Sequence, residues 1–373
     1  MSLIIKEVST KKELKEFIKF PDNLYIGNRF YIPAIHKMEL QTLFFKTNPA
    51  FEFCRTKYWL VIKGEIIVGR IAGIINDKYN KKHNTKIARF GWLDFVENEN
   101  VLKLLIDTVE KWAKENNMNC MQGPLGFTSF DASGFLIEGF NEIPTSFAHY
   151  NFPYYPKLIE THGYRKDIDW VEYTIKVPDI IPEQIIKGSK TIQERYNLHQ
   201  LEIKKTKDIL SYADELFIIL NESYKDLYAF TELSKKQINN LKKHFISLIK
   251  IEYVSIVLNN KNDLVAFGIS IPSMSTALKK ANGKLFPFGY FRIWKALYKN
   301  DTVDLLLIGV KPEYQNKGVH AIIFEKLGQT FKKRKIKYLE TTRELENNNK
   351  VIQLWSGYEH RLHKRSRCYI KKI

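Results

Sequence analysis

The chain has 373 residues, of which 44% are apolar and 13% are aromatic. This composition excludes a largely disordered chain, and the length favours two packed domains over one. The formal net charge of +18 is typical of a surface that binds phosphates, nucleic acid or anionic lipid, but a composition rich in Lys, Asn and Ile also produces it without any function.

The sequence shows no pattern of a membrane-spanning or metal-binding protein. No apolar run approaches the roughly 20 residues that a spanning helix needs, and the N-terminus lacks the pattern of a signal peptide. Cys54, Cys120 and Cys368 lie far apart, and His360 and His363 have no partner at metal-ligand spacing. We therefore expect a soluble, cytoplasmic protein without a bound metal.

The first half of the chain begins with a β-hairpin signal. Two apolar runs flank Lys63 and Gly64, which predicts a hairpin over residues 58–73. The elements expected next are a strand, an amphipathic helix, a short strand and a closing segment, at residues 87–96, 100–117, 119–127 and 161–175.

The second half repeats this order. Prolines and a glycine interrupt the helical and strand periodicity over residues 177–190, so we place a boundary there and predict domains 1–177 and 178–373. Two helices, a hairpin, a strand, a helix, a strand and a basic closing segment are expected to follow, at residues 207–228, 234–250, 253–268, 302–310, 318–332, 336–342 and 348–373. The fold class predicted is therefore a mixed α/β sheet in two similar domains.

A polar turn joins the expected strand at 302–310 to the expected helix. Gly318 permits a close backbone approach, and Gln315, Asn316 and Lys317 offer consecutive N–H groups beside the positive end of the helix dipole. Such a turn binds an anion, most naturally a pyrophosphate. A plain connection between strand and helix is the alternative.

The hairpin, the strand ending in Val-x-Pro, the Gln-x-x-Gly turn, the helix and the next strand together resemble the GCN5-related N-acetyltransferase (GNAT) superfamily. The family's turn is Arg/Gln-x-x-Gly-x-Gly/Ala, so His320 here replaces the last small residue. The resemblance implies two tandem GNAT-like domains and an acetyl-CoA or other acyl-CoA, with its pantetheine arm on a splayed strand end where Gly309 suits a bulge. The implied binding residues are Ile308, Gly309, Val310, Gln315, Asn316, Lys317, Gly318, Val319 and His320.

The first half is similar in order but lacks this turn. Glu97 and Glu99 stand where the phosphates would lie, and acidic residues oppose anion binding. We therefore expect the first half to be a degenerate copy that shapes the acceptor site.

Acyl transfer to an amine requires a base that accepts the amine proton. Asp304 lies within an apolar strand, where burial would raise its pKa, and the histone acetyltransferases that the chain resembles carry a base at the matching offset. Glu340 and Glu344, expected to share a face with Thr342, are reserve candidates for the base or for holding the substrate ammonium. The alternative for all three carboxylates is a solvated position.

The family's general acid is commonly a tyrosine on the last helix. In the family this tyrosine follows an asparagine by seven residues. The residue seven positions after Asn348 is Trp355, which is not a tyrosine, so we predict that Tyr358, nearly one helical turn later, takes its place.

Three functions remain open at this point. The leading one is an N-acyltransferase, in the first place an acetyltransferase, that acts on a small-molecule or peptide amine. The second is a tandem GNAT-like transferase whose donor is an aminoacyl-tRNA or an acyl carrier, as in the peptidyltransferases of cell-wall synthesis. The third is a basic module that binds nucleic acid without catalysis, which the Lys-rich stretch 331–338 favours.

Overall fold

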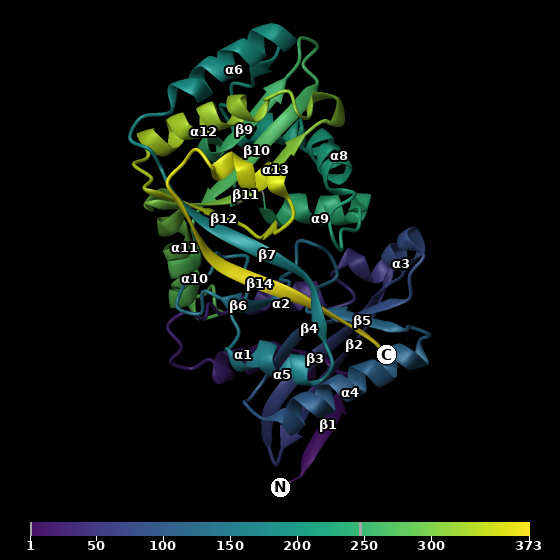
Figure 1. Cartoon of the computed structure of the whole chain (residues 1–373). Coiled ribbons are helices and arrows are strands. Elements are labelled where there is room, and N and C mark those ends of the chain that lie inside the picture. The colour runs from purple at the N-terminus through teal and green to yellow at the C-terminus, as the bar shows by residue number, and fades with distance from the viewer. Residues whose placement is uncertain (1, 246–247) are drawn as a thin grey trace.

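The computed structural model describes residues 2–245 and 248–373, which form one long mixed sheet with helices on both faces (Figure 1). The first half contributes β1 (Leu3–Glu7), α1 (Lys11–Leu24), α2 (His36–Leu43), β2 (Cys54–Lys63), β3 (Ile66–Asn76), α3 (Asp77–His83), β4 (Ile87–Phe95), α4 (Glu99–Glu115), β5 (Cys120–Gly123), β6 (Phe135–Glu138), α5 (Tyr154–Thr161) and β7 (Arg165–Lys176).

The second half contributes α6 (Glu183–Tyr196), β8 (His199–Gln200), α7 (Thr206–Leu210), α8 (Ala213–Tyr224), α9 (Lys235–Phe245), β9 (Val254–Leu258), β10 (Leu264–Pro272), α10 (Ser275–Ala281), α11 (Gly289–Tyr298), β11 (Thr302–Val310), α12 (His320–Lys333), β12 (Tyr338–Thr341), β13 (Glu344–Leu345), α13 (Asn349–Ile352) and β14 (His360–Lys372). Short 3-10 turns precede β2, β9 and α12, and a fourth, η4 (Gln353–Trp355), follows α13.

The two halves build the sheet in the same way. The strand order is β1-β2-β3-β4-β5-β14-β7-β12-β11-β10-β9-β8. Each half has an antiparallel hairpin followed by a parallel pair, β4 with β5 in the first and β11 with β12 in the second. The predicted mixed α/β fold with a repeated order of elements is confirmed.

Two central strands are exchanged between the halves. β14, from the end of the chain, pairs with β5 of the first half, whereas β7 pairs with β12 of the second. β14 and β7 also pair with each other, so the yellow C-terminal strand crosses into the first half (Figure 1). Each half therefore depends on a strand from the other, and the boundary at residue 177 stays a prediction.

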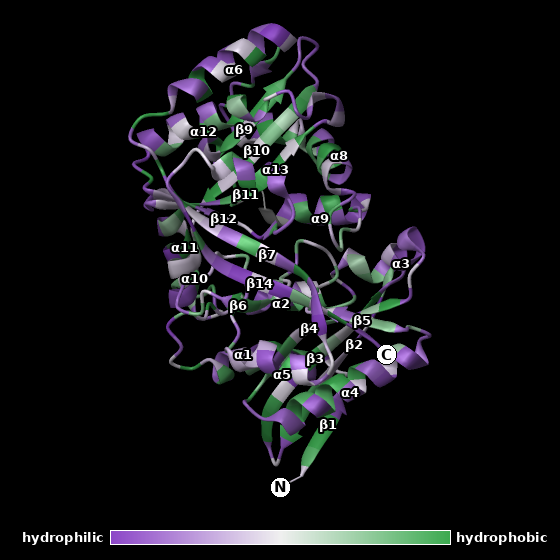
Figure 2. Ribbon diagram, viewed as in Figure 1, coloured by the Kyte–Doolittle hydropathy of each residue, from purple (hydrophilic) through white to green (hydrophobic). Residues whose placement is uncertain are grey.

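The exchanged strands are polar. Figure 2 shows β7 and β14 as largely hydrophilic, whereas β3 and β10 are hydrophobic. Their sequences, RKDIDWVEYTIK and HRLHKRSRCYIKK, account for this contrast. Because charged side chains buried without partners are costly, those at the junction are expected to form paired clusters.

Each half packs one long helix on its central strand. A Cβ on Gly69 of β3 would lie 2.8 Å from Val101 of α4, and a Cβ on Gly268 of β10 would lie 2.4 Å from Ile323 of α12. These close approaches exclude larger residues at both glycines. The two main cores form beneath α4 and α12.

Three details of the sequence prediction change. A helix begins at Glu183, directly after Pro182, inside the stretch that was expected to be irregular, because proline suits the residues that precede a helix. The expected helix at 207–228 is divided into α7 and α8. The expected helix at 234–250 is α9 as far as Phe245, and residues 246–247 lie outside the described part of the chain.

Candidate active site

The candidate site begins where β11 and β12 diverge. The two strands pair in parallel only from Thr302 to Leu305, whereas β11 continues beside β10 as far as Val310. The register with β10 skips Leu306, which is a β-bulge. The bulge expected at Gly309 is therefore wrong: a Cβ on Gly309 would lie 2.5 Å from the Phe267 ring, so close packing explains that glycine instead.

Asp304 lies on β11 just before this divergence and is fully buried. Neither of its carboxylate oxygens has a hydrogen-bond partner of good geometry. Burial raises the pKa of Asp304 to about 7, and the nearby Glu340 carboxylate acts in the same direction, while the Ser273 hydroxyl and the Ser146 amide oppose the rise. A carboxylate with this pKa can accept a proton near neutral pH.

Glu340 pairs in register with Asp304 across the parallel strands. One of its carboxylate oxygens accepts a hydrogen bond from Thr174 Oγ1 at 3.0 Å, and the other lies 2.9 Å from His363 Nε2. His363 comes from the exchanged strand β14 and is buried. The site thus holds two carboxylates and an imidazole from three strands.

Two further cations lie at this junction: Lys364 is buried and Arg343 is half-buried. Lys364 Nζ lies 3.5 Å from Glu172 of β7 and donates to the Ile143 carbonyl at 3.2 Å. Arg343 donates to the carbonyl oxygens of Ser133 and Asp131 at 2.8 and 3.0 Å. The segment of the first half between β5 and α5 therefore closes over Asp304. Sequence reasoning missed these cations because their partners lie in the other half of the chain.

Glu340 and Glu344 do not share a face. β12 ends at Thr341, so the strand alternation does not continue to Glu344. Glu344 instead accepts a hydrogen bond from Trp355 Nε1 at 3.0 Å, and burial raises its pKa to about 7. Of the two reserve carboxylates, only Glu340 lies beside Asp304.

The turn that precedes α12 has the geometry of an anion site. Asn316 and Gly318 have φ values of 60° and 78°. Within the described residues, the backbone amides of positions 316–320 donate no hydrogen bond, and α12 has no side-chain cap. Lys317 Nζ is held over the rings of Tyr196 and Tyr314 at 5.1 and 5.2 Å. These free amides and this lysine fit a pyrophosphate.

The turn is tied to the end of β11. Gln315 Nε2 donates to the Val310 carbonyl at 3.2 Å. The same carbonyl accepts from Ser223 Oγ at 3.1 Å, and the Ile308 carbonyl accepts from Tyr224 at 3.2 Å. The side chain of His320 is half-buried, and burial lowers its pKa, so this residue does not add a positive charge at neutral pH.

Tyr358 lies away from Asp304. It lines an apolar pocket beneath α12, together with Leu305, Leu339, Phe324 and Trp355. Leu305 follows Asp304 on β11, and Leu339 precedes Glu340 on β12. Because neighbouring residues of a strand point to opposite faces, the pocket and the Asp304–Glu340 pair lie on opposite faces of the sheet. Burial raises the pKa of the Tyr358 phenol. Its role as a general acid stays a prediction.

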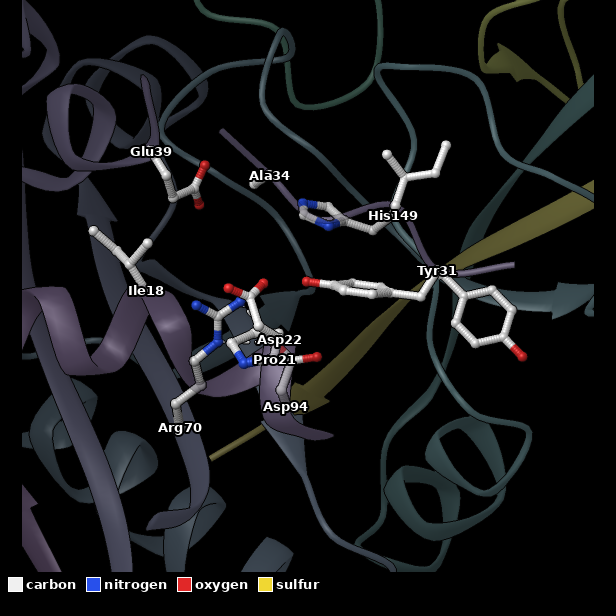
Figure 3. A pocket seen from close by; sticks show the side chains of 11 residues that line it. Ile18, Pro21, Asp22, Tyr31, Ala34, Glu39, Arg70, Asp94 and His149 are labelled. Carbon is white, nitrogen blue, oxygen red and sulfur yellow. Dashed lines mark hydrogen bonds and ion pairs between the residues drawn. The ribbon is translucent and has the colours of Figure 1, made fainter. Parts of the chain in front are cut away.

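The first half has a separate polar pocket. Figure 3 shows Arg70, Asp22 and Asp94 close together, with His149 across from them. Arg70 forms an ion pair with Asp94 at 2.7 Å and donates to the Phe17 carbonyl at 2.8 Å. The side chain of His149 is exposed at the mouth of this pocket. The Arg70 guanidinium is thus held by partners within the fold.

The described residues contain no group of three or more His, Cys, Asp or Glu side chains arranged to hold a metal ion. They also contain no helix long and apolar enough to cross a bilayer.

Comparisons with known proteins agree with this architecture. No family model matches the chain. It is 25% identical to protein YghO of Escherichia coli (strain K12), over 99% of this chain and 95% of that protein. It is 24% identical to bacterial ceramide synthase of Caulobacter vibrioides, over 84% of this chain and 82% of that protein.

A solved structure extends the likeness to the whole fold. The tandem GNAT protein from the clavulanic acid biosynthesis pathway superposes with a TM-score of 0.57 at 11% identity, over 100% of this chain and 98% of that one. The chain therefore has the tandem GNAT fold, and the resemblance inferred from the Gln-x-x-Gly turn is confirmed.

Proposed function

We propose that this protein is an N-acyltransferase that moves an acyl group from acyl-CoA to the amine of a second substrate. The observation that carries the proposal is the placement of Asp304. It is a buried carboxylate with a raised pKa, located where β11 and β12 diverge, and the anion-binding turn is attached to the same strand.

The donor would bind through its phosphates. The amides of residues 316–320 and Lys317 supply hydrogen-bond donors and positive charge at the start of α12. The divergence of β11 from β12 leaves the backbone from Leu306 to Val310 without a partner strand on that side. The backbone groups on this side that are not already bonded to Ser223, Tyr224 or Gln315 would hold the pantetheine arm.

The proton would pass to Asp304. A neutral amine attacks the thioester carbonyl, a C–N bond forms, and the C–S bond breaks as the thiolate leaves. Asp304 accepts the proton that the amine loses, and the Glu340 carboxylate, which accepts a hydrogen bond from Thr174, lies beside Asp304 in the paired strands. The thiolate needs no obligatory acid, because it is a tolerable leaving group.

The acyl group is proposed to be longer than acetyl. The resemblance alone implies acetyl-CoA, but the pocket beneath α12 is lined mainly by apolar side chains, and apolar lining favours a hydrocarbon chain over a two-carbon group. Because this pocket lies on the face of the sheet opposite Asp304, the acyl chain would reach it between β11 and β12, where the two strands diverge. The likeness to a bacterial ceramide synthase supports the same choice and favours a long-chain amine as the acceptor.

The test is a matrix of donors and acceptors. Purified protein would be incubated with acetyl-CoA or palmitoyl-CoA and with a long-chain amino alcohol, a polyamine or a peptide amine. We expect amine-dependent release of free thiol, with an amide product seen by mass spectrometry, and the highest rate for the long-chain pair. Absence of CoA binding by calorimetry would refute the proposal. Loss of CoA binding would at the same time favour an aminoacyl-tRNA or acyl-carrier donor, whereas CoA binding without turnover of any pair would show that the acceptor differs from the amines tested.

A further inference from the structure

The connection between β10 and β11 is a large insertion. The matching connection in the first half spans residues 77–86, whereas this one spans residues 273–301 and contains α10 and α11. The two helices pack against each other at the edge of the second half, beside the junction (Figure 1). We call residues 273–300 the α10–α11 hairpin.

The outer face of this hairpin is aromatic. Ile293 and Leu297 of α11 turn inward and join the small core around Ile271 and Met274. The opposite face of α11 and the loop before it carry six exposed aromatic side chains, with exposed fractions from 55% to 82%: Phe286, Phe288, Tyr290, Phe291, Trp294 and Tyr298. Soluble domains rarely leave such a cluster uncovered.

The aromatic face is rigidly presented. The rings of Phe291 and Trp294 stack at 6.0 Å, and those of Trp294 and Tyr298 lie 5.0 Å apart. The hairpin is attached to the first half, since His36 N donates to the Gly283 carbonyl at 3.1 Å and Ser275 Oγ donates to the Pro144 carbonyl at 2.8 Å. The fold therefore holds these rings outward.

The hairpin is also strongly basic. Residues 273–300 include no Asp or Glu and carry six cations: Lys279, Lys280, Lys284, Arg292, Lys295 and Lys299. Aromatic side chains flanked by Lys and Arg are the composition of helices that lie in the interface of an anionic bilayer. A second copy of the chain is a poorer occupant, because two such faces would bring like charges together.

We propose that the α10–α11 hairpin docks on the surface of a lipid bilayer that contains anionic lipids. Trp294, Phe291 and the neighbouring rings enter the headgroup region, and the exposed lysines of the hairpin contact phosphate groups: Lys280, Lys284, Lys295 and Lys299. Docking by this face requires no spanning helix and no rearrangement of the core.

The hairpin also leads to the candidate active site. Its two ends are joined by a hydrogen bond from the Asn300 side chain to the Ser273 carbonyl, and the Ser273 hydroxyl approaches Asp304. If the acceptor is a long-chain amine, a bilayer-bound hairpin would place it near the base. This last step rests on the proposed function, whereas the docking itself does not.

Vesicle flotation tests the docking without any activity measurement. The full-length protein would be mixed at low salt with phosphatidylcholine vesicles that contain or lack phosphatidylglycerol. We expect binding to the anionic vesicles that is at least about tenfold stronger than to the neutral ones and that weakens as salt is added. Failure of the wild-type protein to float with anionic vesicles would overturn the proposal.

Matched variants locate the binding face. Phe291→Ser with Trp294→Ser should weaken binding at least about tenfold, whereas Phe45→Ser should not, although Phe45 and Phe291 are both 61% exposed. The double variant Lys280→Glu with Lys295→Glu should weaken vesicle binding as the aromatic double variant does. The matched control on α4, Lys111→Glu with Lys114→Glu, should weaken it less. Circular dichroism would verify that each variant is folded. Equal binding by the hairpin variants and their controls would overturn the proposal.

Two further measurements identify the occupant. Brominated lipids should quench the fluorescence of the wild-type protein, and Trp294→Phe should remove most of this quenching while vesicle binding remains. Light scattering would show whether the protein forms a dimer. The proposal would be refuted if the wild-type protein forms a dimer, if it does not bind vesicles, and if Phe291→Ser with Trp294→Ser dissociates that dimer. A second copy of the chain would then cover this face.

Discussion

The two halves of the molecule share one strand arrangement but place opposite charges at the same point. The third residue pair of the parallel strands is Arg89 with Gln122 in the first half and Asp304 with Glu340 in the second. Arg89 and Asp304 are both buried. A cation therefore stands in one copy where the other has its candidate base.

The surroundings of these two charges differ as well. Arg89 donates to the carbonyl oxygens of Gly126 and Ala229 at 3.3 and 3.2 Å and lies 4.8 Å from the Tyr79 ring. Ala229 belongs to the second half, so Arg89 fastens the two halves together. The oxygens of Asp304 have no well-formed partner. A satisfied buried charge supports structure, whereas an unsatisfied one is available for chemistry.

The helices that follow these strands repeat the contrast. Asn98 caps α4, since its side chain accepts from the amides of Asn100 and Val101 at 3.0 and 3.3 Å. The N-terminus of α12 has no side-chain cap. One half therefore satisfies its helix start internally, and the other leaves its amides free for a ligand.

The largest expected effect comes from Asp304→Asn. If Asp304 accepts the amine proton, the rate of acyl transfer should fall by roughly 100-fold to 10,000-fold. Because only the ionised carboxylate can act as a base, the wild-type rate should rise with pH through about 7, and the variant should lose this inflection. CoA affinity should hardly change. Full activity of the variant at neutral pH would show that Glu340 or a water molecule, rather than Asp304, accepts the proton.

Stability provides the control for this variant. The folded-state pKa of Asp304 is raised above its ordinary value of 3.8 to about 7. Its favourable contribution is therefore present at low pH and is lost as pH rises through about 7, so Asp304→Asn should unfold at a higher temperature than the wild type above that pH. Arg89→Met should have the opposite effects. Its melting temperature should be lower than that of the wild type, because two carbonyl groups lose their hydrogen-bond donor, but its turnover per folded molecule should be near normal.

The next effect is on donor binding. Gly318 has a φ of 78°, and a β-branched residue there costs about 1–3 kcal/mol of backbone strain. Gly318→Val should relieve this strain by shifting the turn, which misplaces the amides, so calorimetry should show CoA affinity reduced by roughly tenfold or more. Gly328→Ala, within α12 and at a position with no positive φ, should bind CoA normally. Equal affinities for the two variants would place the phosphates elsewhere.

The sequence predicted the fold and the strand-turn-helix unit because these depend on local patterns. Alternating apolar residues, the Gln-x-x-Gly turn and the helical spacing after it all lie within short stretches. Asp304 was singled out for the same reason: it is a carboxylate within an apolar strand.

The rest of the site depends on long-range pairing that no local pattern contains. His363 and Lys364 lie in the basic closing segment, where His363 was considered only as a rejected metal ligand and Lys364 was not singled out. They are buried because β14 is exchanged into the centre of the sheet, where Glu340 and Glu172 meet them. The aromatic cluster from Phe286 to Tyr298 was missed because no element was predicted between residues 268 and 302, where the structure has α10 and α11.

A smaller effect is expected at Tyr358. Its phenol has a raised pKa and lies on the α12 face of the sheet, away from the Asp304 carboxylate. A raised pKa makes it a weaker acid, and a thiolate leaves readily without one. Tyr358→Phe should therefore slow thiol release by less than about tenfold, below the 100-fold that marks a general acid. A larger loss, with CoA affinity unchanged, would establish Tyr358 as the proton donor.

No effect is expected from neutralising the acids that begin α4. The first half should not bind CoA, since Glu97 and Glu99 oppose phosphates and Asn98 already occupies the amides of Asn100 and Val101. Removing the two negative charges leaves that cap in place, so Glu97→Gln with Glu99→Gln should titrate like the wild type, with one CoA per chain by calorimetry. Adding Asn98→Gly frees the amides but still supplies no Gln-x-x-Gly turn, and the stoichiometry should stay at one. Two sites in the wild type would show that the first copy retains its donor site. A second site that appears only in the triple variant would show that the acids and the cap, rather than the shape of the turn, close it.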